Sequence, residues 1–508
     1  MARIVSADDA VRRIPDGATV VLNPLPLEEV FPAFGRVYQA TGSPKDLTVV
    51  WSAGIGPFSD EPRGLNHFAY RGMVKRLIGG HFGLNHSLAG LVAENAVEAY
   101  NLPQGVIAQM YREVAAKRPG IFTQVGIGTF VDPRVEGGKL NERTRNCEDL
   151  VEVVQVNGQK LLHYKPFRAD VGIIRGTTAD RLGNIGEDDE AIVMENLEVA
   201  IAAKCCGGFV IAQVIQTSDE PLHPHHVRVP GIFVDYVVVA ESKKSHPHTL
   251  FVDDDPSYSG REHTPLEQVF QRMPLNLEKV ICRRAAMELR AGANVNLGVG
   301  IPMGVAAVAH EEGILDTVSF STEVGAIGGL PEGGRNFGPA KNPTAFMSQA
   351  HMFDFYDGGG LDLTCVGLAQ ADREGNVNVS KLGSRIIGCG GFINITQGTR
   401  KCVFCGEFRA GAADIAVDGG RLVIRREGRV PKFLKQVEQI TFSGKFARQQ
   451  GRDVLFVTER CVFRLAPEGL LLCEIAPGVD LQKDILQQME FRPIIPAEIA
   501  PMDPRIFA

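Results

Sequence analysis

Near the N-terminus the chain reads Asp16-Gly17-Ala18-Thr19-Val20-Val21-Leu22, a turn followed by an apolar run. Ser6 and Asp9 form the pattern of a capping box, which predicts a short helix just before this turn. The same order of helix, Gly-Ala turn and apolar run returns at Ala291-Gly292-Ala293-Asn294-Val295-Asn296-Leu297-Gly298, after a helix predicted from Asn276 to Arg290. The second half of the chain therefore begins as the first does.

Two further pairs of segments repeat in the same order. The run from 45 to 54 is matched by the run from 316 to 325, and the run from 170 to 176 by the run from 363 to 369. The last pair also shares a trailing Gly-Asn turn, at Gly183-Asn184-Ile185 and at Gly375-Asn376-Val377. Three ordered matches predict an internal duplication.

Short apolar runs alternate with helical stretches in this sequence. Gly208-Phe209-Val210-Ile211-Ala212, for example, follows a stretch of helical character from 190 to 203. The alternation predicts an α/β fold of two duplicated domains, each with a mostly parallel sheet flanked by helices. We expect domains at 1–245 and 277–508, joined by a polar, proline-bearing linker at 246–276. Active sites in such sheets lie beyond the carboxyl ends of the strands.

The composition is typical of a soluble enzyme. With 508 residues, 44% of them hydrophobic and 22% charged, the chain is long enough to form two hydrophobic cores. The formal net charge of −7 indicates no excess of basic residues that would bind a polyanion. Neither nucleic acid nor an anionic membrane is therefore expected as a partner. Asp8 and Asp9 stand where a signal peptide would be basic and then apolar, and no apolar run reaches transmembrane length. We therefore expect a cytoplasmic protein.

The candidate metal ligands lack the spacing of known metal sites. The ten cysteines form no disulfide framework, and we expect reduced thiols. Cys402-Val403-Phe404-Cys405 matches CxxC, but no second pair follows at zinc-ligand spacing, and its surroundings predict a buried strand. His223-Pro224-His225-His226 and Asp253-Asp254-Asp255 predict polar loops. No metal ion is expected.

Glu323 stands between an apolar run and a glycine-rich turn, in Ser321-Thr322-Glu323-Val324-Gly325-Ala326-Ile327-Gly328-Gly329. A carboxylate held there is a candidate nucleophile for acyl transfer, because glycines let a substrate carbonyl approach the backbone and free N–H groups stabilise developing negative charge. Taken alone, a Glu beside glycines is more often a solvated turn residue. Glu332, Glu459 and Glu474 also flank turns or apolar runs, but none follows a Ser-Thr pair after a strand, and we expect structural or surface roles for them.

Seven segments carry a wider resemblance. They are Asn101-Leu102-Pro103-Gln104-Gly105, the Glu323 segment, and the stretches 126–134, 229–235, 295–302, 353–362 and 457–463. In this order the segments resemble the family I CoA-transferases, and most closely the long single-chain type in which two subunit-like halves are fused. The resemblance covers nearly the whole chain.

The resemblance implies a role for three residues. Glu323 is expected to be the catalytic glutamate, Gln104 to place a side-chain amide near the thioester, and the N–H of Gly391 to complete an oxyanion hole. Because Gln104 and Glu323 come from different halves, the active site is expected in the cleft between the domains. Candidate substrate- and CoA-binding residues are Gly298, Gly300, Pro302, Gly367 and Gly390. No tightly bound cofactor is expected, since coenzyme A is a substrate, and analogy suggests a homodimer or homotetramer.

The family's reaction exchanges CoA between an acyl-CoA and a carboxylic acid. A glutamate that accepts the acyl group as an anhydride and then CoA as a glutamyl thioester conserves the thioester energy, so ping-pong kinetics are expected. The turn after Glu323 lacks the Asn-Gly sequel of ketoacid-specific members, which favours acetate, propionate, butyrate or similar acids. An acyl-CoA thioesterase and a non-catalytic CoA-binding protein stay open as alternatives. The loop from 298 to 304 has GxGxxxG spacing, which disfavours a nicotinamide dehydrogenase.

Overall fold

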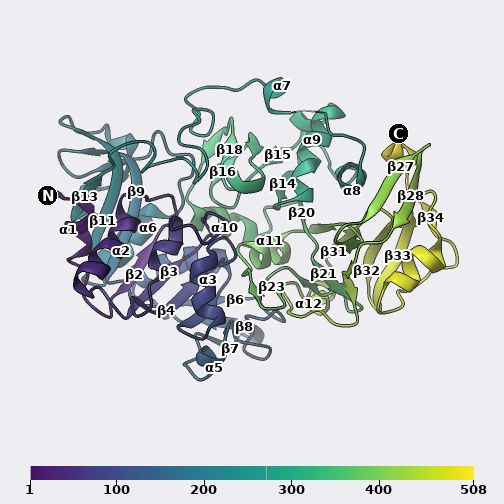
Figure 1. Ribbon diagram of the computed structural model, residues 1–508, viewed down its shortest axis with the longest axis horizontal. Coiled ribbons are helices and arrows are strands. Elements are labelled where there is room, and N and C mark those ends of the chain that lie inside the picture. Colours follow the sequence, from purple (N-terminus) through teal and green to yellow (C-terminus); the bar gives the residue numbers. More distant parts are fainter. Residues whose placement is uncertain (1, 271) are drawn as a thin grey trace.

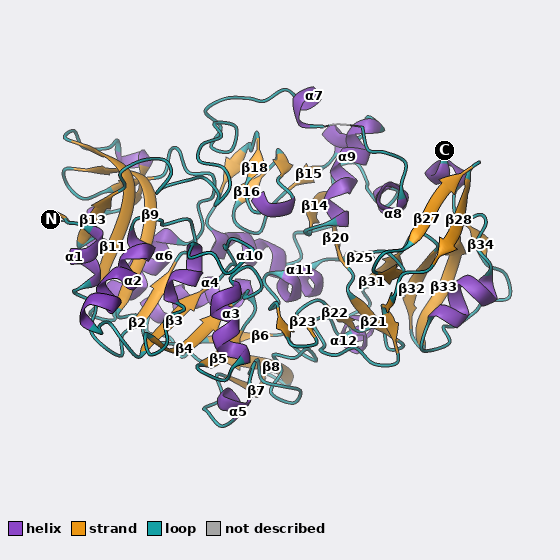
Figure 2. Cartoon of the chain, in the orientation of Figure 1, coloured by secondary structure: helices purple, strands orange, loops and turns teal. Residues whose placement is uncertain are grey.

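The computed structural model describes residues 2–270 and 272–508, and two large sheets dominate it, one from each half of the chain (Figure 1). The sheet at the left of Figure 1 has ten strands, and the sheet at the right has eight. Helices lie against both sheets, and helices α10 (Gln349–Asp357) and α11 (Phe392–Gly398) lie between them (Figure 2). The predicted α/β class is confirmed.

The N-terminal sheet is parallel along its whole main path. Its strands follow the order β1 (Arg3–Ile4), β13 (Tyr236–Val239), β11 (Phe209–Ser218), β9 (Val171–Asp180), β2 (Thr19–Leu22), β3 (Leu47–Trp51), β4 (Val74–Gly79) and β5 (Glu98–Asn101). The short strands β10 (Ile185–Gly186) and β12 (Val227–Val229) extend it in the antiparallel sense.

Helices cover both faces of this sheet. One face carries α1 (Ala7–Val11), α2 (Val30–Thr41) and α3 (His86–Ala93), and the other carries α4 (Gln104–Ala115) and α6 (Asn196–Cys205). Successive strand residues alternate between the two cores, so that Val20 lies in the first and Val21 in the second. Because both faces are buried, these strands read as continuous apolar runs rather than as alternating ones.

The C-terminal sheet begins parallel and ends mostly antiparallel. Its order is β15 (Ser319–Phe320), β14 (Asn294–Leu297), β20 (Leu363–Gly367), β25 (Lys401–Cys405), β31 (Asp453–Val457), β32 (Cys461–Ala466), β33 (Gly469–Ile475) and β34 (Ala500–Pro501). The first five strands are parallel, and the pairs β31–β32 and β32–β33 are antiparallel. Helices α8 (Leu277–Ala286) and α9 (Gly304–Glu311) pack on one face, and α12 (Gly444–Gln449) packs on the other.

The two sheets share one strand order. The parallel series β3-β2-β9-β11-β13 in the first half corresponds to β15-β14-β20-β25-β31 in the second. The three sequence matches fall on the first three strands of each series, so the predicted duplication is visible in the topology. The boundaries predicted for the two domains stay a prediction.

The Gly-Asn turns repeat in atomic detail. The carboxylate of Asp180 accepts hydrogen bonds from the backbone N–H of Asn184 at 2.9 Å and from its side-chain amide at 2.9 Å. Asp372 accepts the same pair from Asn376, each at 3.0 Å. Between them stands a glycine with a positive φ, which is 83° at Gly183 and 74° at the equivalent position of the second turn.

Two predicted helix boundaries differ from the structure. Helix α8 ends at Ala286 rather than Arg290, and α6 begins at Asn196 rather than near Glu190. Within the predicted linker, His246, His248 and Tyr258 are buried, and it contains helix α7 (Leu266–Val269).

The remaining elements are short. They are helix α5 (Glu142–Arg145), the sheet of β6 (Ile121–Thr123), β8 (Gln159–Tyr164) and β7 (Val151–Val156), the sheet of β22 (Val377–Asn378), β21 (Gln370–Asp372) and β30 (Phe433–Leu434), and the strand pairs β16 (Ala326–Ile327) with β19 (Ala345–Phe346), β17 (Leu330–Pro331) with β18 (Ala340–Lys341), β23 (Lys381–Leu382) with β24 (Arg385–Ile386), β26 (Arg409–Ala410) with β29 (Val430–Pro431), and β27 (Asp414–Asp418) with β28 (Arg421–Arg426). None of the described helices has the length and apolar character that a membrane span requires.

Candidate active site

Glu323 lies in a tight turn directly after β15, at an edge of the C-terminal sheet. The turn is closed by hydrogen bonds from Gly325 N–H to the carbonyl of Thr322, at 3.0 Å, and from Thr322 N–H to the carbonyl of Ala326, at 2.9 Å. The Glu323 side chain is only 7% exposed. The turn therefore holds a carboxyl group away from bulk water.

Burial sets the electrostatics of Glu323. Loss of hydration raises the pKa of this carboxyl above its usual value, and hydrogen bonding to its own backbone N–H and to the side chain of Asn296 on β14 opposes that rise only in part. A carboxylate with a raised pKa is a stronger base, and hence a better nucleophile, than a hydrated one. Glu323 is therefore suited to attack a thioester once it is ionised.

Four of the five predicted CoA-binding residues lie at the same edge as Glu323. Gly298 and Gly300 follow β14, Pro302 is buried in the turn after them, and Gly367 ends β20. Because β15, β14 and β20 are adjacent and parallel, their carboxyl ends meet at one edge of the sheet. Gly298 packs so closely on β20 that a Cβ there would lie 3.2 Å from the Cα of Val366.

The N-terminal half faces this edge with the carboxyl ends of its own strands. Val324, next to Glu323, packs in a buried cluster with Leu25, Ala53 and Met194. Leu25 follows β2 and Ala53 follows β3. The two sheets thus turn equivalent edges toward each other, with Glu323 at the junction; a cleft between the domains stays a prediction.

Gln104 and the glycine pair are joined across this junction. Gln104 is the first residue of α4 and is 3% exposed, and its backbone N–H donates to the carbonyl of Gly390 at 3.0 Å. Gly390 N–H in turn donates to the carbonyl of Gly80, at 2.8 Å. The next N–H, that of Gly391, donates to no acceptor among the residues the structure describes. One backbone donor at this junction therefore has no partner in the described part of the protein.

Helix α10 contacts all three predicted catalytic positions or their immediate neighbours. Gln349 accepts a hydrogen bond from the Gln104 amide at 3.2 Å, and Tyr356 shares one with Ser321, two residues before Glu323, at 2.9 Å. Phe353 lies 3.1 Å from the position that a Cβ on Gly391 would take. No sequence pattern points to Gln349, because nothing local distinguishes it from a surface amide.

The rival glutamates are held by cations. Glu459 binds Arg460 at 2.8 Å, Glu474 binds Arg284 at 2.7 Å, and Glu332 lies 3.5 Å from Lys341. A carboxylate engaged by a cation is a weaker nucleophile. These contacts fit the structural roles expected for the three residues.

Cys402 and Cys405 do not form a chelating pair. Both lie in β25, but Cys402 packs in the core on one face of the sheet and Cys405 in the core on the other. Burial raises the pKa of Cys402 to about 12. The predicted buried strand is confirmed, and the two thiols point in opposite directions.

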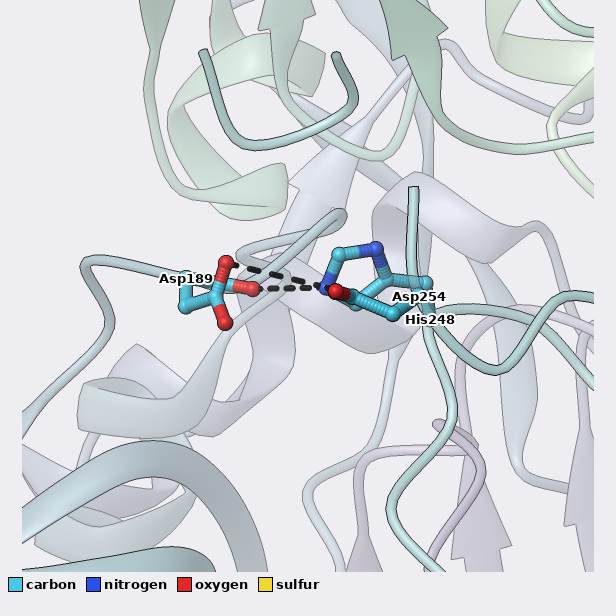
Figure 3. Close-up of side chains that lie close together, drawn as sticks. All are labelled: Asp189, His248 and Asp254. Carbon is cyan, nitrogen blue, oxygen red and sulfur yellow. Dashed lines mark hydrogen bonds and ion pairs between the residues drawn. The ribbon is translucent and has the colours of Figure 1, made fainter. Parts of the chain in front are cut away.

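Asp189, His248 and Asp254 form the one group in the described part of the chain with metal-like geometry (Figure 3). Both imidazole nitrogens of His248 are already used, since Nε2 donates to the Asp189 carbonyl at 2.9 Å and Nδ1 accepts from the Asp255 backbone N–H at 3.1 Å. Lys243 and Arg261 pair with the two carboxylates. The group is therefore an ion-pair network rather than a fitting set of metal ligands.

Comparisons with known proteins identify the class. A family model for coenzyme A transferases matches residues 4–240. The chain is 46% identical to a caffeate CoA-transferase of Acetobacterium woodii, over 100% of this chain and 98% of that protein. It is 41% identical to the acetate CoA-transferase YdiF of Escherichia coli O157:H7, over 99% of this chain and 95% of that protein.

Crystal structures of YdiF from Escherichia coli O157:H7 share the fold. The apoenzyme has a TM-score of 0.93 at 40% identity, and a thioester complex with CoA has a TM-score of 0.92 at 40% identity; each match covers 100% of this chain and 96% of the other. The duplicated α/β architecture is thus that of a CoA-transferase. The chain belongs to the CoA-transferase family, in its long single-chain type, and the enzyme class predicted from the sequence is confirmed.

Proposed function

We propose that this enzyme moves CoA from a short-chain acyl-CoA to a carboxylic acid through a covalent thioester on Glu323. The observation that carries the proposal is the buried carboxyl of Glu323, held in a tight turn where the two halves meet. The relatives include an acetate and a caffeate CoA-transferase, and one related structure is a thioester complex with CoA. Acetate, propionate and butyrate are the acids to test first.

In the proposed cycle a Glu323 oxygen attacks the thioester carbonyl carbon. The C–S bond breaks, CoA leaves as a thiolate, and an acyl-glutamyl anhydride remains. The thiolate then attacks the glutamyl carbonyl of the anhydride, the first carboxylate leaves, and Glu323 carries CoA. The acceptor carboxylate reverses both steps. Protons balance without an external acid or base.

Negative charge develops on the attacked carbonyl oxygen in each step. The free N–H of Gly391 and the amide of Gln104 are the donors we propose for it. Gly298, Gly300, Pro302, Gly367 and Gly390 are proposed to line the path of CoA, as predicted from the sequence. A homodimer or homotetramer, the cytoplasm as the location and the absence of a tightly bound cofactor stay predictions.

The covalent intermediate can be tested by intact-mass spectrometry. Enzyme incubated with acetyl-CoA and no acceptor should gain the mass of CoA, less one water, on a peptide that contains Glu323, and added propionate should remove it as propionyl-CoA. An adduct on another residue, or transfer without any adduct, contradicts the proposal. Steady release of free CoA and acetate without an acceptor would instead indicate a thioesterase.

The oxyanion role of Gly391 can be tested by removing its N–H. Its φ of −80° suits proline, so Gly391→Pro deletes the donor, whereas Gly391→Ala adds a Cβ against Phe353 and keeps it. We expect kcat of the proline variant to fall on the order of 100-fold below that of the alanine variant, because losing one such donor typically has this effect. Steady-state kinetics and CoA binding by calorimetry measure it. Equal kcat for the two variants, or a loss confined to CoA affinity, contradicts the role.

A further inference from the structure

A buried hydrogen-bond chain runs from Gln104 back into the N-terminal half. The Gln104 amide nitrogen donates to the carbonyl oxygen of Gln349 at 3.2 Å, and the Gln349 amide nitrogen donates to the hydroxyl of Ser52 at 2.9 Å. Ser52 donates to Oε1 of Glu195 at 2.5 Å. All four side chains are buried, and Glu195 is 0% exposed. The chain therefore links a proposed catalytic amide to a carboxyl group deep in the protein.

The acceptor at the buried end decides the direction of every bond in this chain. Ser52 has one hydroxyl hydrogen, and once it is given to Glu195 the Ser52 oxygen can only accept from Gln349. That turns the carbonyl oxygen of Gln349 toward Gln104, which must then present its amide nitrogen. Without an acceptor beyond Ser52, both amides are free to rotate by half a turn.

Glu195 is placed to accept a hydrogen bond rather than to form an ion pair. Its Oε2 has no hydrogen-bond partner among the described residues, and the groups that face it are the phenol of Tyr111 on α4 and the carboxyl of Glu198 on α6. Burial raises the pKa of Glu195 to about 8. An unpaired buried carboxyl destabilises the fold relative to an apolar side chain, and a structural role alone does not account for it.

We propose that Glu195 is a positioning residue, which fixes the amide of Gln104 for acyl transfer through Ser52 and Gln349. The proposal rests on the function proposed above. Glu195 touches no substrate; it sets which atom of Gln104 faces the reacting thioester. Its contribution should therefore appear in the rate of acyl transfer to Glu323 and not in the affinity for CoA.

Three variants test the chain. Glu195→Leu removes the acceptor. We expect the single-turnover rate at which acetyl-CoA labels Glu323 to fall about 10- to 100-fold, which is no more than the fall caused by losing a whole oxyanion donor. KM should stay unchanged. Glu195→Gln retains a carbonyl oxygen for Ser52 and should keep the rate within about threefold of wild type. Ser52→Ala breaks the chain one residue later and should match Glu195→Leu.

Glu187 provides a matched control. It is a second buried carboxyl near the start of α6, burial raises its pKa to about 8 as well, and it binds Asn196 rather than Ser52. Glu187→Leu should change the melting temperature about as much as Glu195→Leu while leaving the labelling rate near wild type. An equal loss of rate in both variants would mean that any damage near α6 slows the reaction, and the proposal would be wrong.

A double-mutant cycle separates positioning from general damage. If Glu195 acts through Gln104, then Glu195→Leu should have no further effect on the labelling rate in a Gln104→Ala background. A full effect in that background, or a Glu195→Gln variant as slow as Glu195→Leu, overturns the proposal. Failure of the wild type to label Glu323 at all is a different result, which refutes the proposed function.

Discussion

Glu323→Gln is expected to lose CoA transfer by a factor on the order of 10⁴ or more, as enzymes do when a covalent nucleophile is removed. Glutamine has nearly the same shape but cannot form the anhydride or the thioester. Exchange between acetyl-CoA and propionate, followed by chromatography of the acyl-CoA products, measures the loss, and the CoA adduct should be absent from the intact mass. Glu332→Gln, at a rival carboxylate bound near Lys341, is the matched control and should transfer CoA at close to the wild-type rate.

The same substitution should stabilise the protein. Burial raises the pKa of Glu323 in the native state. The contribution of this carboxyl to the free energy of unfolding is therefore complete at pH values below its pKa in the unfolded chain, and it is lost as the pH rises through its pKa in the folded protein. Glu323→Gln does not titrate, so its melting temperature should exceed that of wild type by a margin that grows with pH over that window. Full activity in the glutamine variant contradicts the assigned nucleophile, while inactivity with a lowered melting temperature indicates misfolding instead.

The duplication could be predicted because its signals are local. A Gly-Ala turn before an apolar run marks β2 and β14, and a trailing Gly-Asn turn follows β9 and β20. Each signal depends on backbone conformation and on burial of a strand on both faces, which neighbouring residues decide. No single segment of the sequence specifies the parallel strand order. The order follows from the packing of helices on both faces of each sheet.

The predicted helix boundaries are wrong where contacts with residues distant in sequence determine where a helix begins or ends. Helix α8 ends early because Glu288 and Leu289 donate to the carbonyls three residues before them, and the Glu288 side chain binds Lys401 on β25. Helix α6 starts late because Glu190 is engaged by Arg175 in a buried ion pair instead of beginning a helix. Neither partner lies within a helical turn in sequence, so periodicity could not reveal it.

The candidate site was predictable only in part for the same reason. Glu323 carries a local signature, a Ser-Thr-Glu segment between a strand and glycines, and it lies where that pattern predicts. Gln349 has no such signature, and its partners Gln104 and Ser52 lie 245 and 297 positions away in sequence. The chain of polar groups exists only after two sheets have brought equivalent edges together.

Gly325→Val is the second substitution with a large expected effect. Gly325 has a φ of +117°, a conformation that a β-branched residue rarely adopts, and a Cβ there would lie 2.2 Å from the carbonyl oxygen of Met347. Strain and overlap together are expected to destabilise the fold by roughly 2–5 kcal/mol. The turn can relieve them only by moving Glu323 away from β14, or by moving the start of α10.

Either movement should slow labelling of Glu323 at least about 100-fold at a temperature where the variant stays folded, since a displacement of about 1 Å at a reacting group can have that effect. Gly90→Ala is the matched control, because a Cβ on Gly90 in α3 meets nothing within 4 Å, and alanine there should be neutral or stabilising. Circular dichroism gives the folded fraction and intact-mass kinetics give the labelling rate. A folded Gly325→Val enzyme that labels as fast as wild type would mean that the conformation of this turn does not position the carboxylate. The nucleophile would then have to be a carboxyl group whose position does not depend on this turn.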